Sequence, residues 1–166
     1  MLSPDIDETP SPDEAPRIYA LRMAQSKAAH IQAAHISGAY VLAADTVVAV
    51  GRRIMPKATD AGQVRACLTL LSGRRHTVLT AITLVTPDGE RSARVSVSTV
   101  SFARLTAAQT DAYVMSNEGL GKAGGYAIQG RAAAFVRALS GSYSGVVGLP
   151  LFETTQLLRG RGYPVP

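Results

Sequence analysis

The sequence has few aromatic residues, one cysteine and no long hydrophobic segment. It contains six tyrosines, three phenylalanines and no tryptophan, which disfavours a platform of stacked aromatic rings for single-stranded nucleic acid. The lone Cys67 excludes an internal disulfide framework and is typical of a reducing, cytoplasmic environment. Because no run of about 18 apolar residues occurs, we expect no membrane-spanning helix and no membrane partner.

Charged residues are also scarce, at 17% of the chain, and they are unevenly distributed. Residues 1–14 hold five acidic side chains and no basic one, although the whole chain carries a net charge of +5. A basic excess suits either nucleic acid or a small anionic substrate. No run of lysine or arginine is longer than two residues. We therefore expect no nucleic-acid partner, and an RNA-binding protein is the weaker alternative.

The length of 166 residues and the hydrophobic content of 46% favour a single domain over residues 1–166. Apolar residues at helical spacing, together with capping signals, predict helices over residues 16–35, 60–71, 106–115 and 150–160. Apolar and β-branched runs predict strands over residues 40–50, 76–86, 91–103 and 132–139. The turn at residues 87–90 predicts a hairpin. This mixture indicates an α/β fold whose sheet is not purely parallel.

The stretch from residue 122 to residue 130 combines one ammonium, one side-chain amide and three glycines. Glycine lets a backbone turn sharply or approach a ligand closely. Lys122 offers a point charge suited to phosphate, and Gln129 offers a donor and an acceptor. A second glycine-rich run covers residues 141–151. Together the two runs favour a site for a phosphorylated small molecule, with ordinary turns as the alternative.

Asp45 is the most unusual charged residue, because it lies inside the apolar segment 41–48, where an unpaired charge is costly. It is either a strand-end acid satisfied by backbone donors, or a metal ligand or general base at the edge of a sheet. In a regular strand Thr46 would point to the opposite face. Taken alone, the other charged candidates are interpreted as solvated surface groups; they are Glu8, Lys27 and Lys57.

Several short motifs follow one another in a distinctive order. They are Asp5-Ile-Asp-Glu-Thr9, Lys27-Ala28, Ala44-Asp-Thr-Val-Val48, Lys57, Leu71-Ser-Gly-Arg74 with His76, Lys122-Ala-Gly-Gly-Tyr-Ala-Ile-Gln-Gly130 and Gly141-Ser-Tyr-Ser-Gly-Val-Val-Gly-Leu-Pro-Leu151. With these motifs the chain resembles the Maf family of nucleotide pyrophosphatases. The resemblance covers residues 4–162, and its specificity comes from the collinear set rather than from any single motif.

The resemblance implies a mixed, twisted sheet flanked by helices, similar to the inosine triphosphate pyrophosphatase-like fold. It also implies hydrolysis of a nucleoside triphosphate to the monophosphate and pyrophosphate, with Mg²⁺ or Mn²⁺ as the divalent cation. The motifs look like the branch of the family that acts on dTTP and UTP, and the branch acting on 7-methyl-GTP is the weaker match. Clearance of noncanonical nucleotides is one role that such an activity would serve.

Roles for individual residues also follow from the resemblance. Asp45 matches the family's proton acceptor, and Glu8, Lys27, Lys57 and Gln129 match its other polar active-site positions. Thr46 and Gln129 match positions that set base choice. The chemistry of these residue types is consistent with the reaction: we expect the carboxylates of Glu8 and Asp45 to hold the divalent cation, since hard cations prefer oxygen ligands. The lysines, with Lys122 as an additional cation, would neutralise the triphosphate.

The chain departs from the family pattern at its beginning. The family normally starts with a strand and a Ser-x-Ser-Pro-Arg-Arg loop of the phosphate site, ahead of the acidic Asp5–Thr9 motif. This sequence starts at the acidic motif, so we expect either an upstream start or a truncated form with an unpaired sheet edge. A catalytically impaired, nucleotide-binding regulator of cell division is the alternative function. The resemblance also implies a homodimer.

Overall fold

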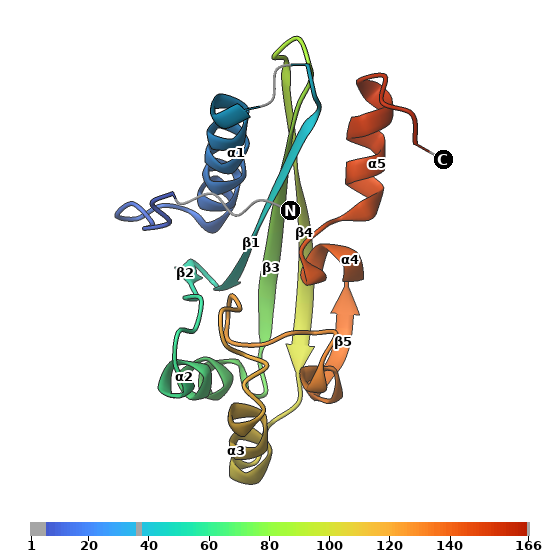
Figure 1. The fold of residues 1–166 in the computed structure, drawn as a ribbon. Coiled ribbons are helices and arrows are strands. Elements are labelled where there is room, and N and C mark those ends of the chain that lie inside the picture. The colour runs from blue at the N-terminus through green and yellow to red at the C-terminus, as the bar shows by residue number, and fades with distance from the viewer. Residues whose placement is uncertain (1–5, 36–37, 166) are drawn as a thin grey trace.

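The computed structural model describes residues 6–35 and 38–165. Within this part of the chain, five strands form one sheet in the order β2-β1-β3-β4-β5, with antiparallel pairing throughout (Figure 1). The strands are β1 (Val41–Val50), β2 (Arg53–Ile54), β3 (Arg75–Val85), β4 (Arg91–Phe102) and β5 (Val136–Ser140). The helices are α1 (Pro16–His35), α2 (Ala61–Leu71), α3 (Ala107–Met115), the 3₁₀ helix η1 (Arg131–Phe135), α4 (Tyr143–Val147) and α5 (Leu151–Gly160). The predicted α/β class is confirmed.

Local signals account for most of the element boundaries. Asp60 caps α2 by accepting a hydrogen bond from the backbone N–H of Gln63 at 2.8 Å. Thr106 and Gln109 form the reciprocal capping box that their spacing predicts at the start of α3. The hairpin between β3 and β4 is also confirmed, and the Thr86 N–H donates to the Glu90 carbonyl across its turn at 3.0 Å.

In the C-terminal third one predicted strand needs correction, and one short helix was not predicted. Residues 131–135 form η1 and not the beginning of a strand, because Ala132 and Phe135 turn into the core before the chain reaches β4. Only residues 136–140 pair with β4. The glycine-rich run after residue 140 contains the short helix α4, which Ser142 caps by accepting from the Gly145 N–H at 2.9 Å.

The sheet carries helices on both faces, and strand alternation decides which residues meet them. On one face, Leu79 and Ala81 of β3 pack with Tyr19 and Met23 of α1. On the other face, Ile82 packs in a cluster with Leu157 of α5. Figure 1 shows α1 on one side of the sheet and α4 and α5 on the other. Because β3 is covered on both faces, nearly all of its residues are buried.

A cluster of aromatic side chains forms the core between the sheet and the 122–130 loop. His76 packs edge-to-face against Phe102 and Tyr126, with ring centroids 5.1 and 5.4 Å apart. Its Nε2 is hydrogen bonded to the Tyr126 hydroxyl at 2.8 Å, and its Nδ1 has no hydrogen-bond partner among the described residues. Burial lowers the pKa of His76 to about 4, because the charged imidazolium is poorly solvated there. His76 is therefore neutral in the folded protein at neutral pH.

We predict that His76 makes stability depend on pH. Its pKa is about 4 in the folded chain and 6.5 as the reference value, so the unfolded state binds more protons between these limits. The contribution of His76 to the free energy of unfolding is fully present above about pH 6.5. It is lost as the pH falls toward 4, by about 3 kcal/mol in total. Urea unfolding across this range should show the decline, and His76→Gln should flatten it. Equal slopes for the two proteins would contradict the assignment.

Candidate functional site

Asp45 lies in the middle of β1 and faces α1. Its side chain is 4% exposed, and its Oδ1 lies 2.5 Å from the Nζ of Lys27, which extends from α1. The partner of this carboxylate is thus a lysine ammonium and not a backbone amide. An ion pair at this distance compensates the cost of placing a charge inside a strand.

Glu8 extends the ion pair into a cluster of four charged side chains. Its Oε1 lies 2.9 Å from the Nζ of Lys27, and its Oε2 accepts a hydrogen bond from Lys57. Lys57 lies in the loop that follows β2. The interpretation of Glu8, Lys27 and Lys57, each taken alone, as solvated surface groups is therefore wrong, because all three are ion paired. We call Glu8, Lys27, Asp45 and Lys57 the charged cluster.

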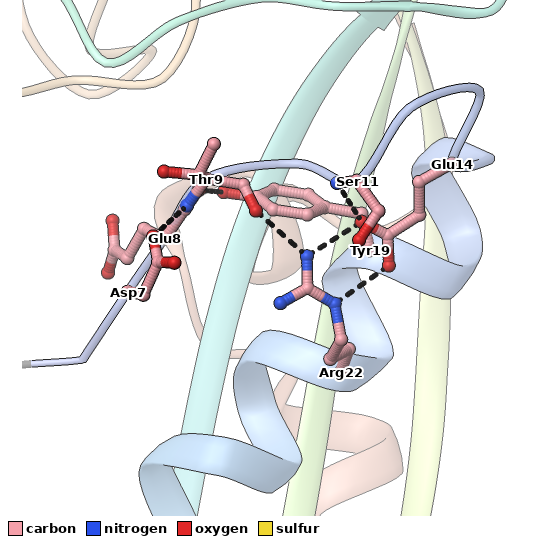
Figure 2. A network of polar contacts seen from close by, with 7 residues as sticks. All are labelled: Asp7, Glu8, Thr9, Ser11, Glu14, Tyr19 and Arg22. Carbon is pink, nitrogen blue, oxygen red and sulfur yellow. Dashed lines mark hydrogen bonds and ion pairs between the residues drawn. The ribbon is translucent and has the colours of Figure 1, made fainter.

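The segment that carries Glu8 is held against α1 by side chains that sequence reasoning missed. The Tyr19 hydroxyl donates to the Glu8 carbonyl at 2.6 Å, and Arg22 donates to the Thr9 carbonyl at 3.1 Å (Figure 2). Arg22 also makes two hydrogen bonds to Glu14, at 2.7 and 2.8 Å. The spacing of Arg22 from Glu14 gave no helical-pair signal, because Glu14 lies before the helix. These contacts set the backbone position from which Glu8 reaches the lysines.

The 122–130 loop packs alongside the segment that carries Lys57. Lys57 and Ala123 form an antiparallel bridge, and the N–H of Gly124 donates to the Pro56 carbonyl at 3.0 Å. Gly124 has a φ of +68°, and a Cβ there would lie 2.8 Å from a methyl group of Val48. Glycine is therefore required both by the backbone conformation and by the close approach to β1.

Two adjoining cavities meet at the charged cluster. One, of about 200 Å³, has Thr46, Lys122 and Gln129 in its lining. The other, of about 330 Å³, is lined by Glu8 and Tyr19 among others. Both include Asp45, Thr46, Lys57 and Ala123. All seven site residues predicted from the sequence thus border these cavities or contact the cluster.

Both cavities are lined by residues of β1. β2 pairs with β1 at Ala49 and Val50, and the Met55 N–H donates to the Val48 carbonyl at 2.8 Å, so within the described chain no strand pairs with this edge from Val41 to Val47. Asp45 and Thr46 are neighbours on this open stretch and point to opposite faces, as strand geometry predicts. Asp45 faces α1, whereas Thr46 hydrogen bonds within the face that carries α4.

The pKa values of the cluster follow from burial and ion pairing. Burial raises the pKa of Asp45 even though Lys27 opposes this shift. Burial acts to raise the pKa of Glu8 as well, but hydrogen bonds from Lys57 and Lys27 outweigh it and hold that pKa below its usual value. For Lys27, burial acts to lower the pKa, and the two carboxylates raise it overall. A buried carboxylate with a raised pKa is suited to general-base chemistry.

Two carboxylates of the charged cluster, those of Glu8 and Asp45, are the oxygen donors that could hold a divalent cation. One carboxylate oxygen of Glu8 and one of Asp45 both contact the ammonium of Lys27, so the two oxygens already surround the position of one cation. Residues 6–35 and 38–165 contain no group of three or more His, Cys, Asp or Glu side chains that could enclose a metal. Mg²⁺ commonly binds through one or two carboxylates with substrate phosphates and water completing its shell.

Among the helices of residues 6–35 and 38–165, none is both long enough and apolar enough to cross a bilayer.

The structure is an α/β protein with an antiparallel sheet. The charged cluster and a cavity lined by Thr46 and Gln129 meet at the open edge of β1. A model of the family described as "Maf-like protein" matches residues 1–161. The chain therefore belongs to the Maf-like protein family, as its motifs predicted.

Curated relatives are similar over most of their length. The dTTP/UTP pyrophosphatase of Rhodospirillum rubrum is 60% identical over 159 residues, which cover 96% of this chain and 75% of the relative. Proteins of the same name from Gluconobacter oxydans and Caulobacter vibrioides are each 56% identical and cover 97% and 96% of this chain, and 76% and 82% of their own lengths. These relatives support a nucleoside triphosphate pyrophosphatase.

Solved structures match as well, and one of them is a nucleoside-triphosphatase, also named dITP/XTP pyrophosphatase, from Mycobacterium abscessus. The match has 25% identity and a TM-score of 0.38, and it covers 63% of this chain and 57% of that chain.

We predict that Gly124→Ala is more destabilising than Gly121→Ala. Both glycines have positive φ, of +68° and +71°, but Gly124 would bring its new Cβ against Val48, whereas no atom of the described residues lies within 4 Å of a Cβ built at Gly121. Both variants should therefore share the backbone penalty of about 1 kcal/mol. Gly124→Ala should lose about 1–3 kcal/mol more, through overpacking. Urea unfolding measures both losses, and equal values would show that the close approach is not required.

Proposed function

We propose that this protein hydrolyses dTTP and UTP to the nucleoside monophosphate and pyrophosphate. The observation that carries the proposal is the charged cluster at the junction of two cavities, with Thr46 and Gln129 in one of them. A nucleotide laid across the open edge of β1 would place its triphosphate at the cluster and its base beside Thr46. The names of the relatives are consistent with this substrate class.

Asp45 is proposed as the proton acceptor. A water oxygen would form a new bond to phosphorus, the α–β phosphoanhydride bond would break, and pyrophosphate would leave with the bond's electron pair. The proton of that water would pass to the Asp45 carboxylate. The raised pKa of Asp45 supports this role, because a base is most effective when its pKa approaches the working pH.

Lys27 and Lys57 are proposed to neutralise the phosphates. Both ammoniums are held by carboxylates in the free protein, so a bound triphosphate would compete with Glu8 and Asp45 for them. We call the cavity of about 200 Å³ that Thr46 and Gln129 line the base cavity. Lys122 is exposed and also lines it, where it would add a further cation. Preorganised positive charges of this kind stabilise charge that develops on the leaving group.

Glu8 and Asp45 are the residues that would hold Mg²⁺ or Mn²⁺, together with the substrate phosphates. When bound, the cation would lower the pKa of water and polarise the phosphoryl oxygens. Glu8 suits this role because its carboxylate stays ionised at neutral pH through its two lysine contacts.

Base choice is proposed to depend on Thr46 and Gln129. The cavity that they line has a volume of about 200 Å³, and Val146 and Val147 of α4 complete its wall. The Gln129 amide can donate to a base carbonyl and accept from a base N–H. A compact, polar cavity of this kind favours a pyrimidine over the larger 7-methylguanine.

The proposal is tested by pyrophosphate release from a panel of nucleotides that includes dTTP, UTP and 7-methyl-GTP. We expect the highest kcat/KM for dTTP and UTP, and loss of release with a chelator. Asp45→Asn should lower kcat by at least about a hundredfold, because the proton acceptor is removed. In the original protein, kcat/KM should fall on the acid side at a pH above 3.8, the ordinary pKa of the group.

Asp111→Asn is the matched control. Asp111 is an exposed carboxylate paired with Arg65 at 2.5 Å, away from both cavities, so its loss should leave kcat unchanged. Nucleotide binding without turnover in the original protein would contradict the enzymatic proposal and favour a binding role. Preference for 7-methyl-GTP would overturn the substrate assignment.

We further propose a homodimer in the cytoplasm. The free thiol of Cys67 is consistent with a reducing compartment. A group of exposed apolar side chains on α4 and α5 supports self-association, since such patches commonly mark interfaces. They are Tyr143, Val147, Leu151 and Phe152.

For the homodimer, we predict that Phe152→Asp shifts the protein to monomers. Phe152 is 72% exposed, and a charge there should be poorly tolerated in an apolar interface. Met115→Asp is the control, because Met115 is equally apolar and 81% exposed but lies on α3. Sedimentation velocity should show monomers for the first variant only. A monomeric original protein would contradict the proposal.

A further inference from the structure

Three hydroxyl residues stand side by side across the sheet, on the face that carries α4 and α5. Thr46 of β1 is in register with Thr80 of β3, and Thr80 is in register with Ser96 of β4. Thr80 is 1% exposed, and its buried hydroxyl contacts Thr46 on one side and Gly145 on the other. Buried polar groups are usually hydrogen bonded, and the partners of Thr80 determine what Thr46 can offer to a ligand.

The direction of the hydrogen bonds follows from counting hydrogens. The Oγ1 of Thr80 donates to the carbonyl oxygen of Gly145 in α4 at 2.6 Å, and a carbonyl can only accept. Thr80 has a single hydroxyl hydrogen, and that contact uses it. The Oγ1 atoms of Thr46 and Thr80 lie 2.9 Å apart, which is a hydrogen-bond distance. Thr46 must therefore donate to Thr80.

The consequence lies in the base cavity, which Thr46 lines. Because the only hydrogen of the Thr46 hydroxyl points at Thr80, the side available to a ligand carries lone pairs alone. To donate to a ligand, Thr46 would have to turn its hydrogen away from Thr80 and leave two oxygen lone pairs facing each other. The buried contact between Thr80 and Gly145 thus makes Thr46 a hydrogen-bond acceptor.

We propose that Thr80 is a positioning residue for base selection: it holds Thr46 as an acceptor, and Thr46 then favours a pyrimidine with an N–H in its ring over one with an unprotonated ring nitrogen. Thymine and uracil carry a hydrogen on N3, whereas the N3 of cytosine is an acceptor. Thr80 itself need not touch the nucleotide. The inference rests on the proposed function, because it assumes that a pyrimidine nucleotide binds beside Thr46.

The experiment compares Thr80→Val with Thr80→Ser. Valine has the shape of threonine without the hydroxyl, and the Gly145 carbonyl keeps its hydrogen bond from the Gly148 N–H at 3.0 Å. With valine, Thr46 is free to donate to cytosine. The ratio of kcat/KM for dTTP to that for dCTP should fall by about tenfold, the effect expected for relieving one mismatched hydrogen bond. A gain in dCTP turnover should contribute to this fall. Serine keeps the hydroxyl and should keep the ratio.

An unchanged ratio in Thr80→Val would overturn the inference, including the case in which both substrates are slowed equally, since that is the effect of a purely structural residue. Circular dichroism and thermal unfolding check that each variant is folded. If Thr80→Val does not fold, Thr80→Ala removes the same hydroxyl with less bulk, and the same two outcomes apply.

Calorimetric binding of dTMP and dCMP to the 166-residue chain separates this inference from the proposed activity. If no pyrophosphate is released, but dTMP binds more tightly than dCMP and Thr80→Val removes the difference, the proposed activity is wrong and the inference stands. If the original protein binds the two monophosphates equally, the inference is wrong whatever the activity.

Discussion

The ion pair between Lys27 and Asp45 is the contact on which the site depends. A carboxylate in the middle of a strand is tolerated because an ammonium from α1 lies 2.5 Å away, and removing one member of such a buried pair costs about 3–5 kcal/mol. The same ammonium also forms an ion pair with Glu8, and Glu8 forms a second ion pair with Lys57. Packing of α1 on the sheet therefore brings Lys27 of the charged cluster to Asp45.

Because successive side chains of a β-strand point to opposite faces, neighbouring residues of β1 belong to different parts of the site. Asp45 and Thr46 are consecutive, so one faces α1 and the charged cluster while the other faces α4 and the base cavity. On the α4 side, the Thr46–Thr80–Gly145 relay links the short helix to the sheet and orients the Thr46 hydroxyl.

Much of the fold was predictable because its signals are local. The caps at Asp60 and Thr106 and the hairpin turn each depend on residues a few positions apart. The 3₁₀ helix at residues 131–135 and α4 were missed, because their short backbone paths are decided by how Phe135 enters the core and how Ser142 caps a turn. The spacing of apolar residues along the sequence indicates neither the packing of Phe135 in the core nor the cap formed by Ser142.

The sequence by itself determined the α/β class, the principal helices and strands, the family, and the candidate residues, because hydrophobic period, capping and collinear motifs are written along the chain. Only the tertiary structure decided that Glu8 meets Lys57, separated by 49 positions, and that Tyr19 and Arg22 hold the segment bearing Glu8. It alone decided the donor direction at Thr46. Contacts between distant segments depend on how helices and loops pack against the sheet, and no local spacing encodes that packing.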